Sequence, residues 1–185
     1  ILDRNKVTGI VNATYLPKEG KITFAQSSLT LDNFKVIWRG DLVLQPAGNL
    51  FDVTFESGQA AFKDILSLHP SILLEDMKHI SASGDFKLMG SIKGLLTDNM
   101  EQVPSFDIEL KVADGNFKID TLSLPVKNIN IDLALQNTTG RWLDTKIDLK
   151  AFHAELGRYP IRGRFKLEGF TDPLIVTDII SKIQL

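Results

Sequence analysis

The chain has 185 residues, of which 43% are hydrophobic and 24% are charged, a composition typical of a globular protein that buries a core. Its formal net charge of −2, from 21 basic and 23 acidic residues, gives no reason to expect a nucleic-acid partner. Because the sequence has no cysteine, it excludes disulfides, a cysteine metal site and a cysteine nucleophile.

The sequence carries no recognisable targeting or anchoring segment. No stretch approaches the roughly 20 consecutive apolar residues that span a bilayer. The opening residues Ile1-Leu2-Asp3-Arg4 do not resemble a signal peptide, and the first residue is not Met. We therefore expect the sequence to be a segment of a longer protein.

The first 56 residues carry the signals of several β-strands. Short runs in which apolar and polar residues alternate are closed by Gly, Asn, Asp or Pro, as in strands joined by turns. These runs predict strands over residues 7–16, 21–25, 29–38, 41–45 and 50–56. The run 29–38 fits either one long strand or two, and Arg39-Gly40 is predicted as a turn.

The hydrophobic period changes between residues 57 and 80. Apolar residues now recur at steps of three and four, as on one face of a helix: Ala61, Phe62, Ile65, Leu66 and Leu68. This pattern predicts an α-helix near 59–69, with Ser57 as the N-cap and Pro70 as the stop. A second short helical or irregular piece is expected over 72–79.

Strand patterns return after residue 80. They predict strands over 84–93, 105–120, 128–137, 143–156 and 162–168. Within 105–120, Asp114-Gly115-Asn116 is predicted as the turn of a hairpin that has one apolar side. Within 143–156 the apolar residues are odd-numbered up to Leu149 and even-numbered from Phe152, which predicts a β-bulge.

These elements predict a mostly β chain, an antiparallel curled sheet or groove of about 11–13 strands with one α-helix. A sheet of that size in one layer would be roughly 50 Å wide, and one helix cannot cover it. Its apolar face must be buried in a barrel, a sandwich or a trough, or against something that is not protein. We treat residues 1–185 as one β-rich segment, which can be subdivided into 1–56, 57–80 and 81–185.

No catalytic or metal-binding pattern emerges. The histidines at 69, 79 and 153 lack the spacing of metal ligands. The serine-rich stretch 81–84 lacks the G-x-S-x-G nucleophile pattern, and a turn is expected there. Acidic residues in the predicted strands occupy the polar phase, where they solubilise an exposed face. We expect no enzyme activity, no metal and no cofactor.

Two further patterns have both a functional and a structural interpretation. The basic residues Arg158, Arg162, Arg164 and Lys166 fit a lipid phosphate headgroup, but such charges more often belong to a solvated or edge-protecting strand. Asn12 and Asn137 each begin a glycosylation sequon, a pattern so loose that chance is the simpler explanation.

Six stretches carry a family resemblance through their order and spacing. They are "TFESGQAAFKDILSLHPSIL" (54–73), "SASGDFKLMGSIKGLL" (81–96), "VPSFDIELKVADGNFKI" (103–119), "LPVKNINIDLALQN" (124–137), "LDTKIDLKAFHAELGRYPIRGRF" (143–165) and "DPLIVTDIISKIQL" (172–185). In this order the chain resembles the AsmA family of Gram-negative bacteria, in the form found in Bacteroidota. The resemblance covers most of the chain beyond residue 54.

The resemblance implies a fragment of a long periplasmic protein that an N-terminal helix anchors to the inner membrane. Members of the wider superfamily are thought to build a long curled sheet whose apolar inner face carries lipid towards the outer membrane, and the family is not known as an enzyme. The expected partner is a phospholipid or other acyl lipid, with the membrane reached only through parts absent from this chain. A protein partner at an exposed edge strand is also expected.

On this resemblance the inward, lipid-facing residues are expected on three strands. They are Phe106, Ile108, Leu110, Val112, Ile129, Ile131, Leu133, Leu135, Phe165 and Leu167. The predicted helix, with Phe62, Ile65 and Leu66, is expected to plug or cap one end of the sheet. The alternative is a structural or protein-binding β module in which the same side chains form a closed apolar core. A hydrolase is a remote third class.

Overall fold

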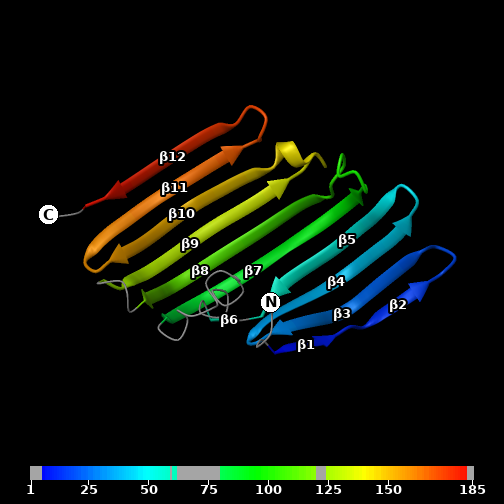
Figure 1. Cartoon of the computed structure of the whole chain (residues 1–185), viewed down its shortest axis with the longest axis horizontal. Coiled ribbons are helices and arrows are strands. Elements are labelled where there is room, and N and C mark those ends of the chain that lie inside the picture. The colour runs from blue at the N-terminus through cyan, green and yellow to red at the C-terminus, as the bar shows by residue number, and fades with distance from the viewer. Residues whose placement is uncertain (1–5, 59, 62–79, 120–123, 183–185) are drawn as a thin grey trace.

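The computed structural model describes residues 6–58, 60–61, 80–119 and 124–182. Their strands form one antiparallel sheet of 12 strands that is curled and not closed (Figure 1). The strands are β1 (Val7–Ile10), β2 (Ala13–Leu16), β3 (Lys21–Leu31), β4 (Phe34–Gln45), β5 (Gly48–Ser57), β6 (Ala60–Ala61), β7 (Ile80–Leu96), β8 (Ser105–Ile119), β9 (Val126–Asn137), β10 (Lys146–Leu156), β11 (Tyr159–Glu168) and β12 (Leu174–Ser181).

The order of the strands across the sheet follows the order of the chain. The main path runs β1-β3-β4-β5-β7-β8-β9-β10-β11-β12, while β2 pairs with β3 and β6 pairs with β7. Tight turns make this order possible: Asp32, at φ 54°, lies between β3 and β4, and Gly157, at φ 63°, lies between β10 and β11. Most neighbouring strands of the main path are therefore consecutive in the chain, and β1 and β12 lie at opposite edges.

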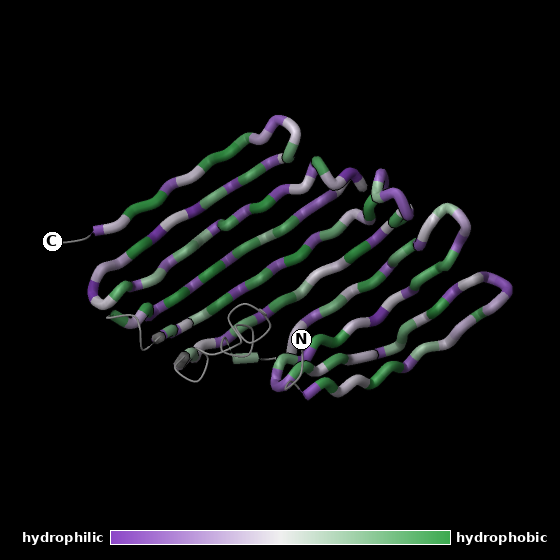
Figure 2. The backbone as a smooth tube through the Cα atoms, viewed as in Figure 1, coloured by the Kyte–Doolittle hydropathy of each residue, from purple (hydrophilic) through white to green (hydrophobic). Residues whose placement is uncertain are grey.

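The register places side chains of one kind on each face of the sheet. Directly opposed residues of antiparallel strands share a face, and successive residues alternate between faces. The face that carries Ile108 of β8 also carries Leu135 of β9 and Ile147 of β10, whereas Asp107, Gln136 and Lys146 lie opposite one another on the other side. We call these the apolar face and the polar face. Figure 2 shows the alternation as short green and purple segments along the strands.

A small buried cluster occupies one end of the apolar face. Its members are Phe34, Ala60, Phe86, Val112, Ile129 and Ala154. The rings of Phe34 and Phe86 meet edge to face at 5.9 Å, the geometry that aromatic pairs prefer. The cluster fixes β4, β6 and β7 relative to one another at this end.

At the other end of the strands, Asn137 organises the connection between β9 and β10. Its side chain is 1% exposed. Its Nδ2 group donates to the Arg141 carbonyl (2.6 Å) and to Thr145 Oγ1 (3.1 Å), and its Oδ1 accepts from the N–H groups of Thr139 and Gly140. All four hydrogen-bonding positions of the amide are therefore used, as burial requires. A 3-10 turn, Trp142–Asp144, completes the connection.

The α-helix predicted near 59–69 is not borne out by the described residues, which contain no α-helix. Ala60 and Ala61 instead pair with Phe86 and Asp85 as strand β6. The Ser57 hydroxyl does not cap a helix but accepts a hydrogen bond from the Leu88 N–H (2.9 Å). The remainder of the predicted helix, with Phe62, Ile65 and Leu66, lies outside the described residues, as does the piece predicted over 72–79.

The hairpin predicted within 105–120 is wrong, because β8 runs through Asp114-Gly115-Asn116 without reversing. A two-residue hairpin turn of the common type needs two successive residues at positive φ. Here Asp114 alone adopts one (51°), while Ala113 and Asn116 continue to pair with Asp85 and Ser83 of β7. The segment is a β-bulge in a single strand.

Several other observed strand boundaries also differ from the predicted ones. The run 29–38 divides between β3 and β4 at a turn through Asp32, whereas Arg39-Gly40, predicted as a turn, lies inside β4. The stretch 81–84 is part of β7 and not a turn. The bulge predicted within 143–156 is confirmed by the shift of register between Leu149 and Phe152 in the pairing with β11.

Candidate functional site

The apolar face is continuous across the sheet, because opposed residues form rows perpendicular to the strands. One row crosses eight strands, from β4 to β12: Trp38, Phe55, Gly90, Ile108, Leu135, Ile147, Leu167 and Ile175. A second row runs beside it through Leu88, Leu110, Leu133, Leu149 and Phe165. None of these side chains carries a charge.

The structure brings the ten predicted lipid-facing residues of β8, β9 and β11 onto this face. Ile108, Leu135 and Leu167 share the first row, and Leu110, Leu133 and Phe165 share the second. Val112 pairs with Ile131, and both Val112 and Ile129 belong to the buried cluster. Phe106 lies at the opposite end of β8, across from Asn137. The ten residues therefore differ in burial, although they share a face.

The central rows are only half-buried. Among the described residues, the largest side chains below 2% exposure are Asn137 and Ser27, both polar, so no large apolar side chain reaches that level. All the described strands belong to the one sheet, and the 3-10 turn is too short to form a second layer. In a closed core, large apolar side chains would be among the most buried.

The whole-chain surface agrees with this arrangement. The accessible surface is 12402 Å² for a chain of 20.6 kDa. A compact monomer of that mass exposes about 8,900 Å². A single-layer sheet whose apolar face no described element covers contributes to this excess.

The Phe55 ring covers the position in the first row where β7 contributes only Gly90. A Cβ added to Gly90 would come 2.7 Å from the Phe55 Cζ atom and 2.8 Å from the backbone oxygen of Asp107. The ring therefore lies over the backbone of β7, and glycine is required for that approach. The apolar surface continues from Trp38 to Ile108 without a polar gap.

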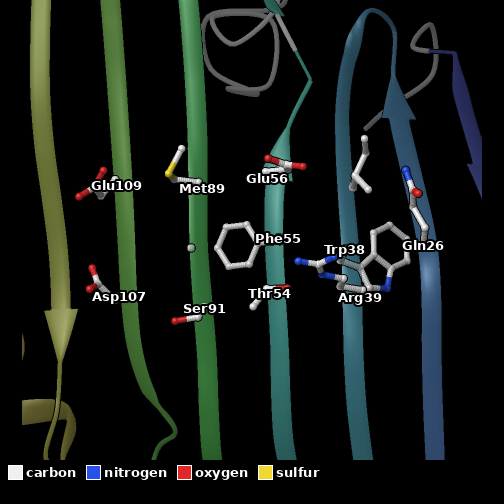
Figure 3. Close-up of a pocket in the computed structure, with 12 residues that line it drawn as sticks. Gln26, Trp38, Arg39, Thr54, Phe55, Glu56, Met89, Ser91, Asp107 and Glu109 are labelled. Carbon is white, nitrogen blue, oxygen red and sulfur yellow. The ribbon is translucent and has the colours of Figure 1, made fainter.

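A hollow of about 480 Å³ lies over β3, β4, β5, β7 and β8 (Figure 3). Most of its lining side chains belong to the polar face, among them Arg39, Thr54, Glu56, Ser91, Asp107 and Glu109. Three carboxylates and one guanidinium line it. Sequence reasoning missed this hollow, because alternation shows which residues share a face but not where that face is concave.

A second hollow, of about 750 Å³, lies beside the bulge of β10 and is lined both by basic side chains and by the apolar side chains of Phe152, Ile179 and Ile180. Lys150, Arg162 and Arg164 line it, together with His153 and Asp178. Asp178 accepts a hydrogen bond from Arg164 Nε at 2.6 Å, which neutralises one of these cations.

The other two members of the basic run lie elsewhere. Arg158 stacks over the Tyr159 ring, and Lys166 pairs with Glu168 at 2.7 Å. The run therefore does not act as one phosphate site.

The remaining candidates for chemistry are the histidines and the two sequons. His153 lies 3.8 Å from Glu155, and the other two histidines fall outside the described residues. No group of His, Asp or Glu in the described ranges could hold a metal ion. Of the two sequons, the one at Asn137 is buried, while Asn12 is exposed and donates to the Gln26 carbonyl.

Ion pairs on the polar face shift a few pKa values. The hydrogen bond from Thr23 and the neighbouring Lys21 hold the pKa of Asp41 below its ordinary value of 3.8. Lys166 similarly lowers the pKa of Glu168, and Asp52 raises the pKa of Lys93. The side chains of Asp41, Glu168 and Lys93 are 37%, 29% and 73% exposed, so the shifts report surface pairing rather than a tuned catalytic group.

Within the described ranges, no helix has the length and apolar character needed to cross a membrane. In the comparisons with known proteins, no family model, no curated protein and no solved structure matches this chain.

Proposed function

We propose that this chain is a non-enzymatic β-sheet segment of an AsmA-like periplasmic protein, and that its apolar face binds the acyl chains of phospholipids during outer-membrane lipid homeostasis. The observation that carries the proposal is the continuous row from Trp38 to Ile175, which is half-buried except at the exposed Ile175 and is uncovered by any described element. An uncovered apolar surface of this extent marks a site of interaction.

The physical chemistry of the face favours a long, flexible, apolar ligand. Each methylene removed from water contributes about 0.8 kcal/mol, so a 16-carbon chain lying along the rows gains up to roughly 13 kcal/mol before the costs of ordering. Apart from the indole N–H of Trp38, the rows contain no hydrogen-bonding side chain, and they contain no charged side chain that would select a polar ligand. The face therefore suits acyl chains of varied length and saturation.

The first experiment identifies bound lipid. The chain is purified from cells without detergent, and an organic extract is analysed by mass spectrometry beside an extract of a soluble β protein from the same cells. Near-stoichiometric phospholipid is the expected result. An extract without lipid, even after incubation with phospholipid vesicles, would overturn the proposal.

A matched pair of substitutions then locates the lipid. Leu135→Asp places a carboxylate in the first row, whereas Lys146→Asp places the same side chain in the adjacent pair of the ladder, on the polar face. We expect Leu135→Asp to lose about 90% or more of the bound lipid, because a carboxylate beside an acyl chain would be desolvated. Lys146→Asp should retain it.

Circular dichroism of the two variants separates binding from folding. A half-buried position at an open face should accept Asp and keep the strand spectrum. If Leu135→Asp unfolds the chain while Lys146→Asp does not, the face is a closed core and the alternative of a structural module is preferred.

A further inference from the structure

The edge strand β12 is unusually apolar for a strand with one free side. Among the described strands it pairs only with β11, so one row of its backbone N–H and C=O groups has no strand partner. Ile175 and Ile179, on the apolar face, are 55% and 74% exposed, and Ile180, on the polar face, is 71% exposed. A strand that is apolar on both faces is typical of the interior of a sheet, not of its edge.

The opposite edge of the sheet is protected. It consists of two short strands, β1 and β2, interrupted at Val11-Asn12. At the interruption the Asn12 N–H donates to Ser27 Oγ and the Asn12 side chain donates to the Gln26 carbonyl, which turns these groups inward. Short, broken edge strands of this kind are how proteins prevent unwanted pairing. Only β12 offers a long, regular edge in the described part of the chain.

We propose that β12 is a self-association surface, on which a second copy of this chain adds its own β12 antiparallel about a two-fold axis through Thr177. In this register Ile175 of one copy faces Ile179 of the other, Leu174 faces Ile180, and the two Thr177 residues face each other. Aliphatic pairs and Thr–Thr pairs are favourable cross-strand neighbours. The proposal does not depend on whether the apolar face binds lipid.

Neighbouring registers fit less well. If the two-fold axis moves by half a residue, odd-numbered residues of one copy lie opposite even-numbered residues of the other. The apolar face of one copy would then lie beside the polar face of the other. Moving it to Asp178 sets two carboxylates directly opposite each other, and moving it to Val176 sets Asp178 opposite Leu174. The axis through Thr177 keeps every isoleucine of the strand opposite an aliphatic residue.

Charge complementarity supports the same register. Asp178, which would face Val176 of the second copy, is neutralised within its own chain by Arg164 at 2.6 Å. Continuing the register beyond the strand brings Lys182 near Asp172 of the other copy, at both ends of the interface. Both residues are exposed, and neither makes an ion pair with another described residue.

Single cysteines test the register directly, since the sequence contains no other cysteine. Thr177→Cys lies on the axis, so two copies place their thiols about 5 Å apart, and mild oxidation should give a covalent dimer on a non-reducing gel. In Ile175→Cys the two thiols would be about 14 Å apart along the strand, and no dimer should form. An equal mixture of Ile175→Cys and Ile179→Cys should cross-link again.

Two results would overturn the proposal: no cross-link in Thr177→Cys, or equal cross-linking in Thr177→Cys and Ile175→Cys. The first would mean that the edge accepts a different partner, and the second that the chains associate without register. Thr8→Cys, on the opposite edge, controls for collision, and circular dichroism confirms that each variant is folded.

Charge exchange provides an independent readout. Asp172→Lys and Lys182→Asp each place like charges at both ends of the dimer, and sedimentation velocity should show dimerisation weakened about tenfold or more. Mixing the two variants should restore it, because every end then has one charge of each sign. A wild-type chain that stays monomeric to high micromolar concentration, or a mixture no stronger than the single variants, would contradict the proposal.

Discussion

Asp41 shows how single residues on the polar face are tuned by their cross-strand neighbours. Thr23, directly opposite on β3, donates a hydrogen bond to Asp41 Oδ1 at 2.7 Å, and Lys21 lies 3.0 Å from Oδ2. Both contacts favour the ionised carboxylate, which lowers its pKa in the folded chain. A lowered folded pKa stabilises the fold above the ordinary pKa of 3.8, and this contribution is lost as pH falls through the folded value.

Thr23→Val tests this assignment. The substitution removes the contact with the largest effect on Asp41, so the pKa of Asp41 should rise towards 3.8, and the stability of the variant should depend less on pH in acid. An NMR titration of the Asp41 carboxyl group measures the shift. Thr54→Val, on the same face of β5, is the control. An unchanged Asp41 pKa in Thr23→Val would show that Lys21 alone sets it.

At the scale of the strand, alternation predicted most of this sheet and failed where a local signal has two meanings. The runs 50–56, 128–137 and 162–168 lie within β5, β9 and β11, because each has one uninterrupted apolar phase. The sequence predicted turns at Asp114-Gly115 and Arg39-Gly40, because glycine and residues with positive φ occur both in turns and in β-bulges. Only pairing with the neighbouring strand decides between the two.

For the candidate site, too, alternation predicted some features and missed others. That Ile108, Leu135 and Leu167 share a face followed from the period of two, but their register across three strands did not. Nor could alternation show that no described element covers the face, or where hollows form on the other side. These properties depend on the order and curl of the strands, which long-range pairing determines.

The bulge in β10 gives a prediction at this scale. Between Leu149 and Phe152 the strand has one more residue than either neighbour, so deleting Lys150 should remove the bulge and leave every other apolar side chain on its face. We expect a urea midpoint close to that of the wild type. Strand β5 pairs with both of its neighbours without a shift of register. Deleting Thr54 from it should therefore move the side chains of part of the strand to the opposite face and strongly lower the urea midpoint. Similar losses in both deletions would contradict this account of the bulge.

At the scale of the whole molecule, the sheet exposes apolar surface while retaining regular pairing. It has ten strands on its main path and spans about 45 Å across them at the usual strand spacing. A chain with this much uncovered apolar surface is ordinarily only partly folded, whereas here the uncovered surface belongs to the folded state.

A dye that fluoresces on apolar surfaces tests this distinction. Native chain freed of lipid should enhance 8-anilinonaphthalene-1-sulfonate fluorescence at neutral pH while keeping a near-ultraviolet circular dichroism signal from Trp38 and Trp142. Added phospholipid should displace the dye. Strong dye binding without the near-ultraviolet signal would indicate loose packing instead, and no dye binding would indicate a covered face.

The agreement between chain order and strand order, described above for the main path, has a consequence for how the molecule folds. Most strands of the path pair with the next strand in the chain, so most of the loops that must close are short and their entropic cost is small; the longest connection is residues 58–79, between β5 and β7. Pairing can then advance from one hairpin to the next, without waiting for distant segments to meet. Such a sheet can form progressively as the polypeptide emerges from the ribosome, in the order in which its strands are made.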